Sequence, residues 1–571
     1  MSQLLKHTLA LVFLLLLPIL LPQLILNTQA QTTSPTPQTQ APSLACKSSV
    51  YPKLCRSILS AFRNAPSNPS GYGKFTVKQS LKQAKKLSKI INRYLKKSKY
   101  KIEMSHEERN AIEDCGQLFD LTVDYLETIT LELKKADSMT DGLIGKIETL
   151  LSGVMTNQDT CYDGLVDSRS SLATALKEPI SNATVLYSVS LGLVTRAIGR
   201  DRKRGPRKGN VWGEGFPTNI TLSKLKKYLR EYAKGGPGRK LDEAAGIVVD
   251  NIVVVDPEGY GNFTTIGEAV ESAPNNLKPE QGYYIIYAVK GIYEEYVTVP
   301  KQKTNLMLLG VGINHTVITG NHSVIDGWST FNSATFAVAG ERFVAIDVTF
   351  KNTAGPEKHQ AVAVRNNADI STFYRCSFEG YQDTLYVHSL RQFYRECDIY
   401  GTVDFIFGNS ASVFQACNIY ARKPMPYQKN AITAQGRSDP NQKTGISIHN
   451  CTIQAAPDLA MDTNGTTQNY LGRPWKEYSR TVYMQSYIGD LITPDGWLEW
   501  NGTVGLDTLF YGEYRNHGPG SNTTRRVQWP GYGRLNATQA WNFTVFNLTL
   551  GDTWLPYTTI PFVEGLLIDV D

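Results

Sequence analysis

The sequence predicts an N-terminal all-α four-helix bundle followed by a C-terminal all-β right-handed parallel β-helix. At 571 residues the chain is longer than one ordinary domain. Between residues 45 and 200, apolar residues recur every three or four positions and Lys and Glu occupy the other face, which is typical of amphipathic helices. Beyond residue 247, short β-rich segments return at a period of roughly twenty-odd residues, which is typical of a stacked solenoid.

Residues 1–30 have the pattern of a signal peptide. Lys6 and His7 precede an apolar run from Leu9 to Leu26, and a small-residue exit follows near Ala30. Two prolines disfavour a membrane-spanning helix, but the length of the run keeps a signal anchor as the alternative. Residues 31–44 are rich in Thr, Gln and Pro and are predicted to be a disordered spacer.

Other features agree with secretion to the extracellular space. The eight cysteines are an even number, which fits an oxidising compartment. Acceptor sequences for N-glycosylation recur along the chain, and they include Asn182, Asn219, Asn262, Asn464, Asn501 and Asn542.

The predicted bundle, residues 45–200, contains four cysteines. Cys46 and Cys55 bracket Tyr51-Pro52 closely enough to tie a short hairpin, whereas Cys115 and Cys161 lie in different predicted helices and can clamp them together. Four cysteines allow three connectivities, so the pairs Cys46–Cys55 and Cys115–Cys161 are a hypothesis.

Residues 201–246 are basic and rich in Gly and Pro, which predicts an exposed linker. The dibasic pair Arg239-Lys240 suggests a processing site near residues 239–241, because proteases cleave unstructured backbone.

The predicted β-helix, residues 247–571, contains Val-, Ile-, Phe- and Tyr-rich segments such as Ile252–Val255 and Phe343–Phe350. A β-sandwich is the competing fold, but it would call for more Asn-Gly or Asp-Gly hairpin turns.

The net charge of +7 and the pI near 8.7 favour an anionic partner, although a role in solubility alone explains them equally well. Nucleic acid is not supported, because no zinc-finger, RNA-recognition or helix-turn-helix signature is present. An acidic polysaccharide satisfies the same charge balance.

Two aspartates are candidate catalytic groups. Asp383 and Asp404 stand among apolar and aromatic neighbours and are about one solenoid period apart, so they are expected to face the same side on adjacent coils. Paired carboxylates in an apolar cleft tend to separate their pKa values, so one can be a nucleophile and the other a general acid. The alternative is that both aspartates cap turns.

Neighbouring residues strengthen the catalytic interpretation. Gln382 and Gln360 offer N–H donors for an oxyanion, and Arg473 can hold a carboxylate in a bidentate fork. Four aromatic residues can stack on sugar rings, although core packing is the alternative for each of them: Trp475, Trp497, Tyr381 and Phe405.

Four further cysteines lie in the predicted β-helix. Cys397 and Cys417 flank Asp404 and are expected to form a disulfide between consecutive coils, which leaves Cys376 and Cys451 as buried thiols. No His-x-x-x-His or Cys-x-x-Cys set predicts a metal, no Gly-x-Ser-x-Gly motif predicts a serine hydrolase, and no phosphate-binding loop is present.

Several motifs resemble the signature blocks of plant pectin methylesterases. They are residues 382–386 (QDTLY), 403–408 (VDFIFG) and 471–475 (LGRPW), supported by residues 359–363 (HQAVA) and 432–437 (ITAQGR). The resemblance covers about residues 252–562. The cysteine spacing around Tyr51-Pro52 makes the N-terminal region similar to the pectin methylesterase inhibitor fold.

The resemblance implies a parallel β-helix and a set of residue roles. Asp404 would be the nucleophile that attacks a methylated galacturonate, and Asp383 would be the proton donor and then the base. Gln382 and Gln360 would stabilise the oxyanion, Arg473 would orient Asp404 and the substrate, and Thr335 and Trp475 would line subsites. No metal or organic cofactor is implied.

The resemblance also implies partners and a location. The substrate would be methyl-esterified pectin in the cell wall, and the inhibitor-like region would act on the enzyme within the same chain. Separate inhibitor proteins and a subtilisin-like processing protease would be further partners. The family's processing sites usually have two leucines after the dibasic pair, whereas this chain has Leu241-Asp242, which puts efficient cleavage in question.

The esterase is the first hypothesis, and two alternatives to it remain at this stage. A β-helical polyuronide hydrolase or lyase would use the same aspartates, but it would shorten the polymer. A lyase would also usually need clustered acidic residues for calcium, and no dense cluster accompanies the pair. In the third hypothesis, the N-terminal bundle is an interaction module that silences an esterase in cis or in trans.

Overall fold

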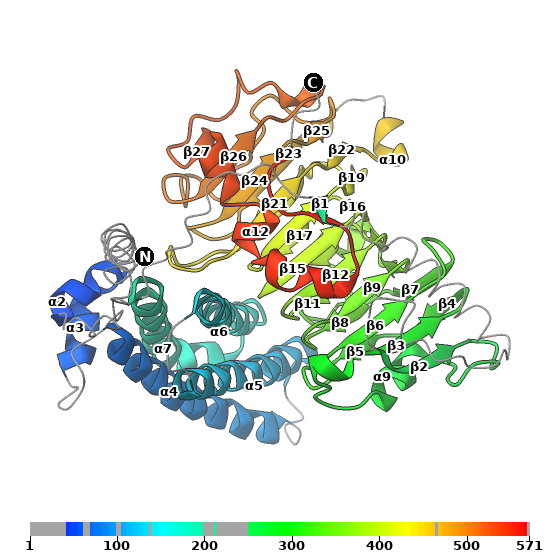
Figure 1. Ribbon diagram of the computed structural model, residues 1–571. Coiled ribbons are helices and arrows are strands. Elements are labelled where there is room, and N and C mark those ends of the chain that lie inside the picture. Colours follow the sequence, from blue (N-terminus) through cyan, green and yellow to red (C-terminus); the bar gives the residue numbers. More distant parts are fainter. Residues whose placement is uncertain are drawn as a thin grey trace, which may run out of the picture.

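The computed structural model describes residues 41–60, 69–98, 104–135, 140–197, 211–212, 249–462 and 466–567. They form a helical bundle that packs against a β-helix (Figure 1). The predicted leader and the predicted processing site at 239–241 lie outside the described residues. The spacer was predicted to extend to residue 44, but a helix already begins at Pro42, where proline suits the first helical turn. In the described ranges, no helix is both long and apolar enough to cross a membrane.

Four long helices make up most of the described part of the bundle. A short hairpin of α2, η1 and α3 precedes them, and the bounds are α2 (Pro42–Ala45), η1 (Cys46–Ser48), α3 (Pro52–Ser60), α4 (Pro69–Ser98), α5 (His106–Lys135), α6 (Asp141–Asp167) and α7 (Ser171–Ala197). Helix α5 packs on α4 and α6, and α7 also packs on α4 and α6. The predicted disulfides Cys46–Cys55 and Cys115–Cys161 are both formed.

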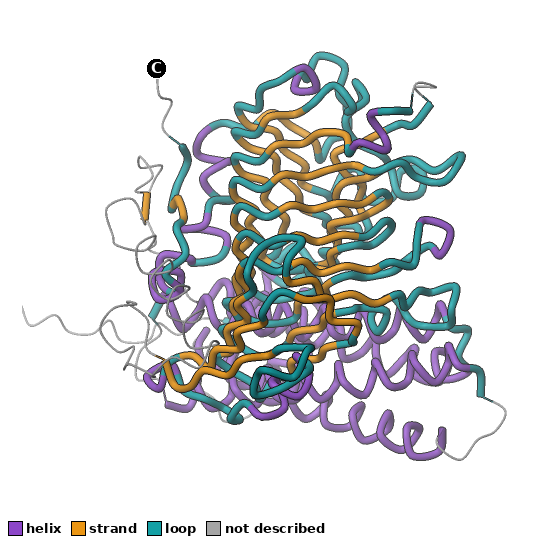
Figure 2. Tube along the Cα trace, turned by 90° about the vertical axis from the view of Figure 1, so that its right-hand side faces the viewer, coloured by secondary structure: helices purple, strands orange, loops and turns teal. Residues whose placement is uncertain are grey.

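The C-terminal domain is a right-handed parallel β-helix built from three sheets, whose coils stack along one axis (Figure 2). The 11-stranded sheet contains β2 (Val249–Val255), β3 (Tyr283–Ala288), β6 (Leu306–Leu309), β9 (Val344–Ile346), β12 (Ser371–Tyr374), β15 (Arg391–Arg395), β18 (Ala411–Gln415), β21 (Gly445–His449), β24 (Arg480–Met484), β26 (Phe510–Tyr514) and β27 (Tyr532–Arg534). The 8-stranded sheet contains β4 (Gly291–Glu294), β7 (Thr316–Gly320), β10 (Thr349–Asn352), β13 (Ser377–Glu379), β16 (Asp398–Gly401), β19 (Asn418–Ala421), β22 (Thr452–Ala455) and β25 (Tyr487–Ile488). The 7-stranded sheet contains β5 (Val297–Val299), β8 (Phe336–Val338), β11 (Val364–Asn366), β14 (Leu385–Tyr386), β17 (Val403–Gly408), β20 (Asn430–Gln435) and β23 (Asn469–Pro474).

The predicted solenoid period is confirmed by the strand register. Ser377 pairs with Asp398, and Asp398 pairs with Asn418, so a coil takes 20 or 21 residues here. All strand pairs within the three sheets are parallel, which excludes the β-sandwich, because hairpin-connected strands pair in antiparallel fashion.

Short helices and turns complete the C-terminal domain. They are α9 (Ile266–Ser272), α10 (Pro457–Ala460), α11 (Ala537–Trp541), α12 (Val545–Leu548), η2 (Pro279–Gln281), η3 (Pro356–Lys358), η4 (Pro519–Ser521), η5 (Gly551–Thr553) and η6 (Leu555–Thr558). Trp541 and Phe546 of α11 and α12 pack in one apolar cluster with the 11-stranded sheet. In the predicted linker, β1 (Val211–Trp212) pairs antiparallel with β28 (Phe562–Val563).

The predicted disulfide between Cys397 and Cys417 is wrong. Both residues are buried free thiols, as are Cys376 and Cys451, and each follows a left-handed residue at the same corner of its coil. Side chains in register on parallel strands point the same way and keep the strand spacing of about 4.8 Å, whereas bonded cysteines need Cβ atoms about 3.5–4.5 Å apart. The thiols therefore stack as a ladder inside the coils.

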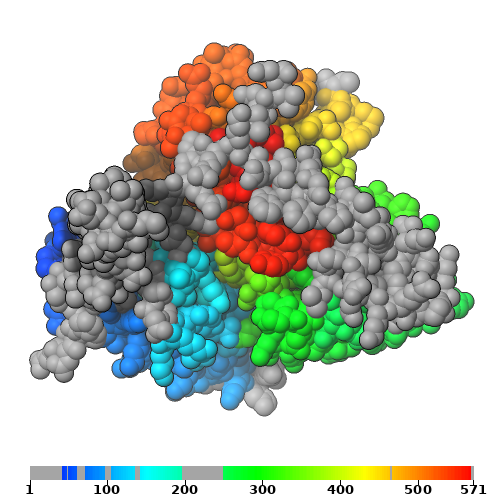
Figure 3. Space-filling view, in the orientation of Figure 1, coloured from blue at the N-terminus to red at the C-terminus, as the bar shows by residue number. Residues whose placement is uncertain are grey.

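The bundle and the β-helix share an apolar cluster. Leu118 and Leu151 of the bundle belong to it, together with Phe331, Tyr386 and Phe407 of the β-helix. Figure 3 shows the cyan helices lying directly against the green and red parts of the β-helix. The bundle therefore covers part of the outer face of the 7-stranded sheet.

Candidate active site

Asp383 and Asp404 occupy equivalent positions on adjacent coils, as the sequence predicted. Leu385 pairs with Ile406, which places each aspartate two residues before a paired position. Both aspartates have positive φ angles, 63° and 53°. In β17 the register slips by one residue between Val403 and Ile406, which is a β-bulge at Asp404. Such bulges redirect side chains, and strained backbone of this kind is concentrated at functional sites.

Arg473 binds Asp404 through two parallel hydrogen bonds. Its Nε donates to Oδ1 at 2.8 Å and its Nη2 donates to Oδ2 at 2.7 Å. The preceding Gly472 lets β23 lie close to β20, since a Cβ atom there would lie 2.1 Å from Thr433 Oγ1. Bidentate pairs of this kind fix the orientation as well as the charge of a carboxylate.

The two carboxyl groups have different electrostatic environments. Burial and the neighbouring Asp404 raise the pKa of Asp383 well above its usual value, and Arg473 opposes this rise only from a distance. Burial also raises the pKa of Asp404, but the hydrogen bonds and charge of Arg473 counteract that rise. The arrangement favours a protonated Asp383 beside an ionised Asp404.

The pair lines a cavity of about 750 Å³ between the β-helix and the bundle. Gln360, Gln382, Arg473 and Trp475 line the same cavity, so the structure brings these predicted residues together. Gln382 Oε1 is buried and has no hydrogen-bond partner among the described residues. The Gln382 amide therefore has hydrogen-bonding capacity that the described protein groups leave unused.

Six aromatic residues of the cavity were missed by the sequence analysis: Tyr162, Trp328, Phe331, Tyr386, Phe407 and Trp500. The Tyr386 and Phe407 rings stack at 4.2 Å, and Trp500 lies 4.4 Å from the guanidinium carbon of Arg473. Tyr386 and Phe407 stand inside the motifs that contain the two aspartates. Simple strand alternation from Asp404 would have selected Ile406 instead of Phe407, because the β-bulge at Asp404 moves Phe407 to the cavity side.

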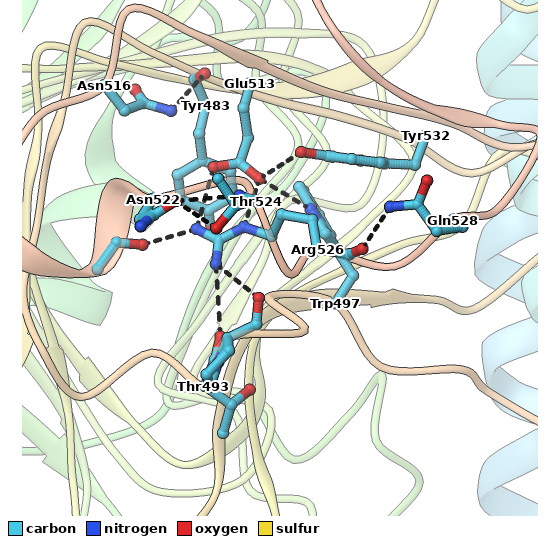
Figure 4. A network of polar contacts seen from close by, with 12 residues as sticks. Tyr483, Thr493, Trp497, Glu513, Asn516, Asn522, Thr524, Arg526, Gln528 and Tyr532 are labelled. Atoms are coloured by element: carbon cyan, nitrogen blue, oxygen red, sulfur yellow. Dashed lines mark hydrogen bonds and ion pairs between the residues drawn. The ribbon is translucent and has the colours of Figure 1, made fainter.

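Two of the predicted sugar-stacking residues belong to the interior instead. Phe405 is 0% exposed and lies inside the coils, because neighbouring residues of a strand point to opposite faces. Trp497 is 1% exposed, and its Nε1 donates to the carboxylate of Glu513, which also binds Arg526 and Tyr532 (Figure 4). Both predictions are wrong, because these two rings are packed in the core of the β-helix.

Tyr381 and Thr335 do not line the cavity either. Tyr381 lines a separate hollow, where Arg422 stacks 3.7 Å from the ring centroid and its Nη2 donates to the phenol oxygen. Thr335 is fully buried, and its Oγ1 donates to the carbonyl of Lys351 at 3.0 Å. In this structure both side chains have partners within the β-helix.

Helices α5 and α6 hold the rim of the cavity. Asp114 of α5 accepts hydrogen bonds from Ser329 and Asn332. On α6, Thr160 contacts His388 Nε2 at 3.0 Å and Asp163 accepts from Lys476 at 2.7 Å. A third α6 residue, Asp159, accepts from Ser438 at 2.6 Å. The bundle is therefore bonded to the β-helix on several coils around the aspartate pair.

Comparisons with known proteins agree with this architecture. The family model described as Pectinesterase matches residues 251–552, and the model described as Plant invertase/pectin methylesterase inhibitor matches residues 40–193. Two Arabidopsis thaliana proteins, probable pectinesterase/pectinesterase inhibitors 47 and 25, are 62% and 61% identical, and the matches cover 93% and 92% of this chain and 87% of each relative.

A solved structure gives the same picture for the C-terminal domain. The pectin methylesterase from carrot is 52% identical, with a TM-score of 0.54, and the match covers 55% of this chain and 98% of the carrot chain. The chain therefore belongs to the pectinesterase family, with an N-terminal domain of the plant invertase/pectin methylesterase inhibitor family.

Proposed function

We propose that the protein demethylates methyl-esterified homogalacturonan, releasing methanol and pectate through an acyl-enzyme on Asp404. The observation that carries this proposal is the asymmetry of the pair: two aspartates share one register on adjacent coils, and Asp404 alone of the two is bound by Arg473. The family of the chain and the carrot relative, whose name states pectin methylesterase, support the same reaction.

The proposed chemistry has two steps. Ionised Asp404 attacks the C6 carbonyl carbon, and amide donors of Gln382 and Gln360 stabilise the oxyanion. Protonated Asp383 gives its proton to the departing methoxide, so methanol leaves and Asp383 becomes a carboxylate. That carboxylate then takes a proton from water, which attacks the acyl-enzyme and restores both aspartates.

The decisive variant is Asp404→Asn, which keeps the shape and removes the nucleophile. We expect methanol release from methylated pectin to fall by about a thousandfold or more, because removing a covalent nucleophile abolishes the acyl-enzyme route. Asp398→Asn is the matched control, since Asp398 lies on the neighbouring 8-stranded sheet and binds Asn418. Full activity of Asp404→Asn would refute the mechanism, and new reducing or unsaturated ends would favour a hydrolase or lyase instead.

We also propose that the bundle inhibits the attached β-helix until the two are separated. The support is positional: Asp114 and Asp163 line the same cavity as Asp383 and Asp404, so a polymer cannot lie along that groove while the bundle is docked. Separated bundle should suppress methanol release by the β-helix fragment. Unchanged activity at saturating bundle would contradict inhibition.

The proposed location is the cell wall, reached by secretion and followed by removal of the bundle by a subtilisin-like protease. Four of the predicted glycosylation asparagines are exposed, which supports modification during secretion: Asn182, Asn262, Asn501 and Asn542. Mass spectrometry of the secreted protein would locate the glycans and the new N-terminus.

A further inference from the structure

Helix α4 carries a continuous row of cations along one face. We name as the α4 stripe the residues Lys74, Lys78, Lys82, Lys85, Lys89, Arg93 and Lys96, all of which are exposed. Successive members are three or four positions apart, which puts them on the same side of a helix. At the helical rise of 1.5 Å per residue, the row extends for roughly 33 Å.

Few negative charges lie near enough to neutralise the positive charges of the α4 stripe. Helix α4 contains eight lysines and one arginine but no aspartate or glutamate, whereas the whole chain has a net charge of only +7. Among the described residues, the ion pair recorded for the stripe joins Lys85 to Glu127 of α5 at 2.6 Å. Like charges at this spacing destabilise a helix by about 0.2–0.5 kcal/mol per pair, so helix stability does not explain the row.

The α4 stripe remains open while the bundle covers the cavity. The opposite face of α4 buries Val77, Ala84, Leu87 and Ile91 in the bundle core. In Figure 1, α4 runs along the edge of the bundle that faces away from the β-helix. Among the described residues, no recorded hydrogen bond or ion pair joins α4 to the β-helix, and none of its residues lines the cavity.

We propose that the α4 stripe binds an anionic polyuronate chain, the demethylated form of the polymer. A linear polyanion matches a linear row of cations, and each carboxylate that it places on the stripe relieves repulsion between lysines. The choice of polymer rests on the proposed function, because demethylation by the separated β-helix turns the surrounding polymer into a polyanion. A membrane surface fits less well, because no large apolar side chain of α4 is exposed for insertion.

The test measures binding of the full chain, with both domains present, to unmethylated polygalacturonate. In Lys78→Gln/Lys82→Gln/Lys89→Gln/Arg93→Gln, we expect affinity at low salt to fall about tenfold and its salt dependence to flatten, since fewer counterions are released. Glutamine is a good helix former, so the helix should persist, which circular dichroism checks. The set Lys78→Arg/Lys82→Arg/Lys89→Arg should bind like the unchanged protein.

The matched control removes four positive charges elsewhere on the bundle, from the exposed lysines Lys47, Lys53, Lys134 and Lys177. We expect this variant to lose less than threefold in affinity. Equal losses in both quadruple variants would overturn the proposal in favour of net charge alone. Tighter stripe-dependent binding to phosphatidylserine vesicles than to polygalacturonate would also overturn it. Methanol release is measured separately, so failure of the esterase mechanism would not be mistaken for failure of this surface.

Discussion

At the scale of single residues, Arg473 gives two otherwise similar aspartates different electrostatic environments. Asp383 and Asp404 share register, positive φ and burial, but the guanidinium is bonded to Asp404. The activity of the uncovered β-helix should therefore fall as pH drops through the pKa of Asp404 and fall again as pH rises through the raised pKa of Asp383.

Arg473→Gln should move one side of that pH profile more than the other. Without the guanidinium, burial raises the pKa of Asp404 further, so a higher pH is needed to ionise the nucleophile. We expect the acid limb of kcat/KM to shift to higher pH and kcat to fall by about a hundredfold. A profile that keeps its acid limb would show that Arg473 does not control Asp404.

Arg526 provides a stability test away from the chemistry. Its guanidinium binds both oxygens of Glu513, and the two side chains are 1% and 3% exposed. Arg526→Ala leaves the Glu513 charge buried without its ion-pair partner, so we expect about 3–5 kcal/mol less stability in denaturant unfolding. Lys358→Ala, which breaks the exposed ion pair with Asp326, should lower stability far less, because exposed ion pairs contribute little.

The sequence predicted the polar residues of the cavity better than the aromatic ones. Asp383, Asp404, Gln360 and Gln382 stand in motifs whose spacing equals one coil. An aromatic ring pointing into the coil and one pointing into the cavity look alike in sequence, so Phe405 was chosen two residues before Phe407. The bulge at Asp404 adds to the difficulty, because it breaks simple alternation at that point.

At the scale of elements, helices α5 and α6 make the contact between the domains sensitive to pH. Burial raises the pKa of Asp114 to about 7 and that of Asp159 to about 6, whereas a free aspartate has a pKa of about 3.9. Since docking raises both values, docking takes up protons. The contribution of these two aspartates to the stability of docking is fully present below pH of about 4, and it is lost as pH rises through about 6–7.

The full chain should consequently regain activity on pectin as the pH rises from about 4 to 7. The activity is expressed relative to the β-helix fragment at each pH, which removes the enzyme's own pH profile. Asp114→Asn keeps one oxygen that can accept from Asn332, and its amide N–H can donate to Ser329, but it cannot ionise, so it should flatten the rise. An unchanged pH dependence in this variant would assign the effect to other groups.

The elements themselves were predictable and their contacts were not. Apolar spacing identified the bundle, and strand texture identified the solenoid. Surface acids such as Asp114 and Asp163 are indistinguishable in sequence from solvated residues, because their partners Ser329 and Lys476 lie more than two hundred residues away. The cysteine ladder was missed for a similar reason, since flanking positions suggested a bond that parallel stacking disfavours.

At the scale of the whole molecule, docking narrows the access to the site but leaves the site assembled. The ion pair between Arg473 and Asp404 is intact beneath the bundle, and the cavity of about 750 Å³ is within the range of small-molecule pockets. Two residues of its lining, Val166 and Trp500, are 48% and 38% exposed, so the cavity has a mouth to solvent.

We therefore expect the full chain to discriminate by size. It should release methanol from monomeric methyl galacturonate at a rate within about tenfold of the β-helix fragment, but on polymeric pectin the fragment should be faster by about a hundredfold or more. Methanol assays on both substrates, with the full chain and with the β-helix fragment, measure this discrimination. Equal suppression on the two substrates would mean that the bundle disables the catalytic groups themselves.

The shared register of Asp383 and Asp404 has a consequence for how the domain can change its length. The ion pair joins β17 to β23, the last strand of the 7-stranded sheet, and Gln382 and Asp383 lie just before β14, so the site occupies the C-terminal half of that sheet. In stacked repeats each coil contacts only its neighbours. Coils could thus be added or lost at the N-terminal end, before β11, giving a longer or shorter track for the polymer, whereas loss of the coil that contains β23 would remove Arg473.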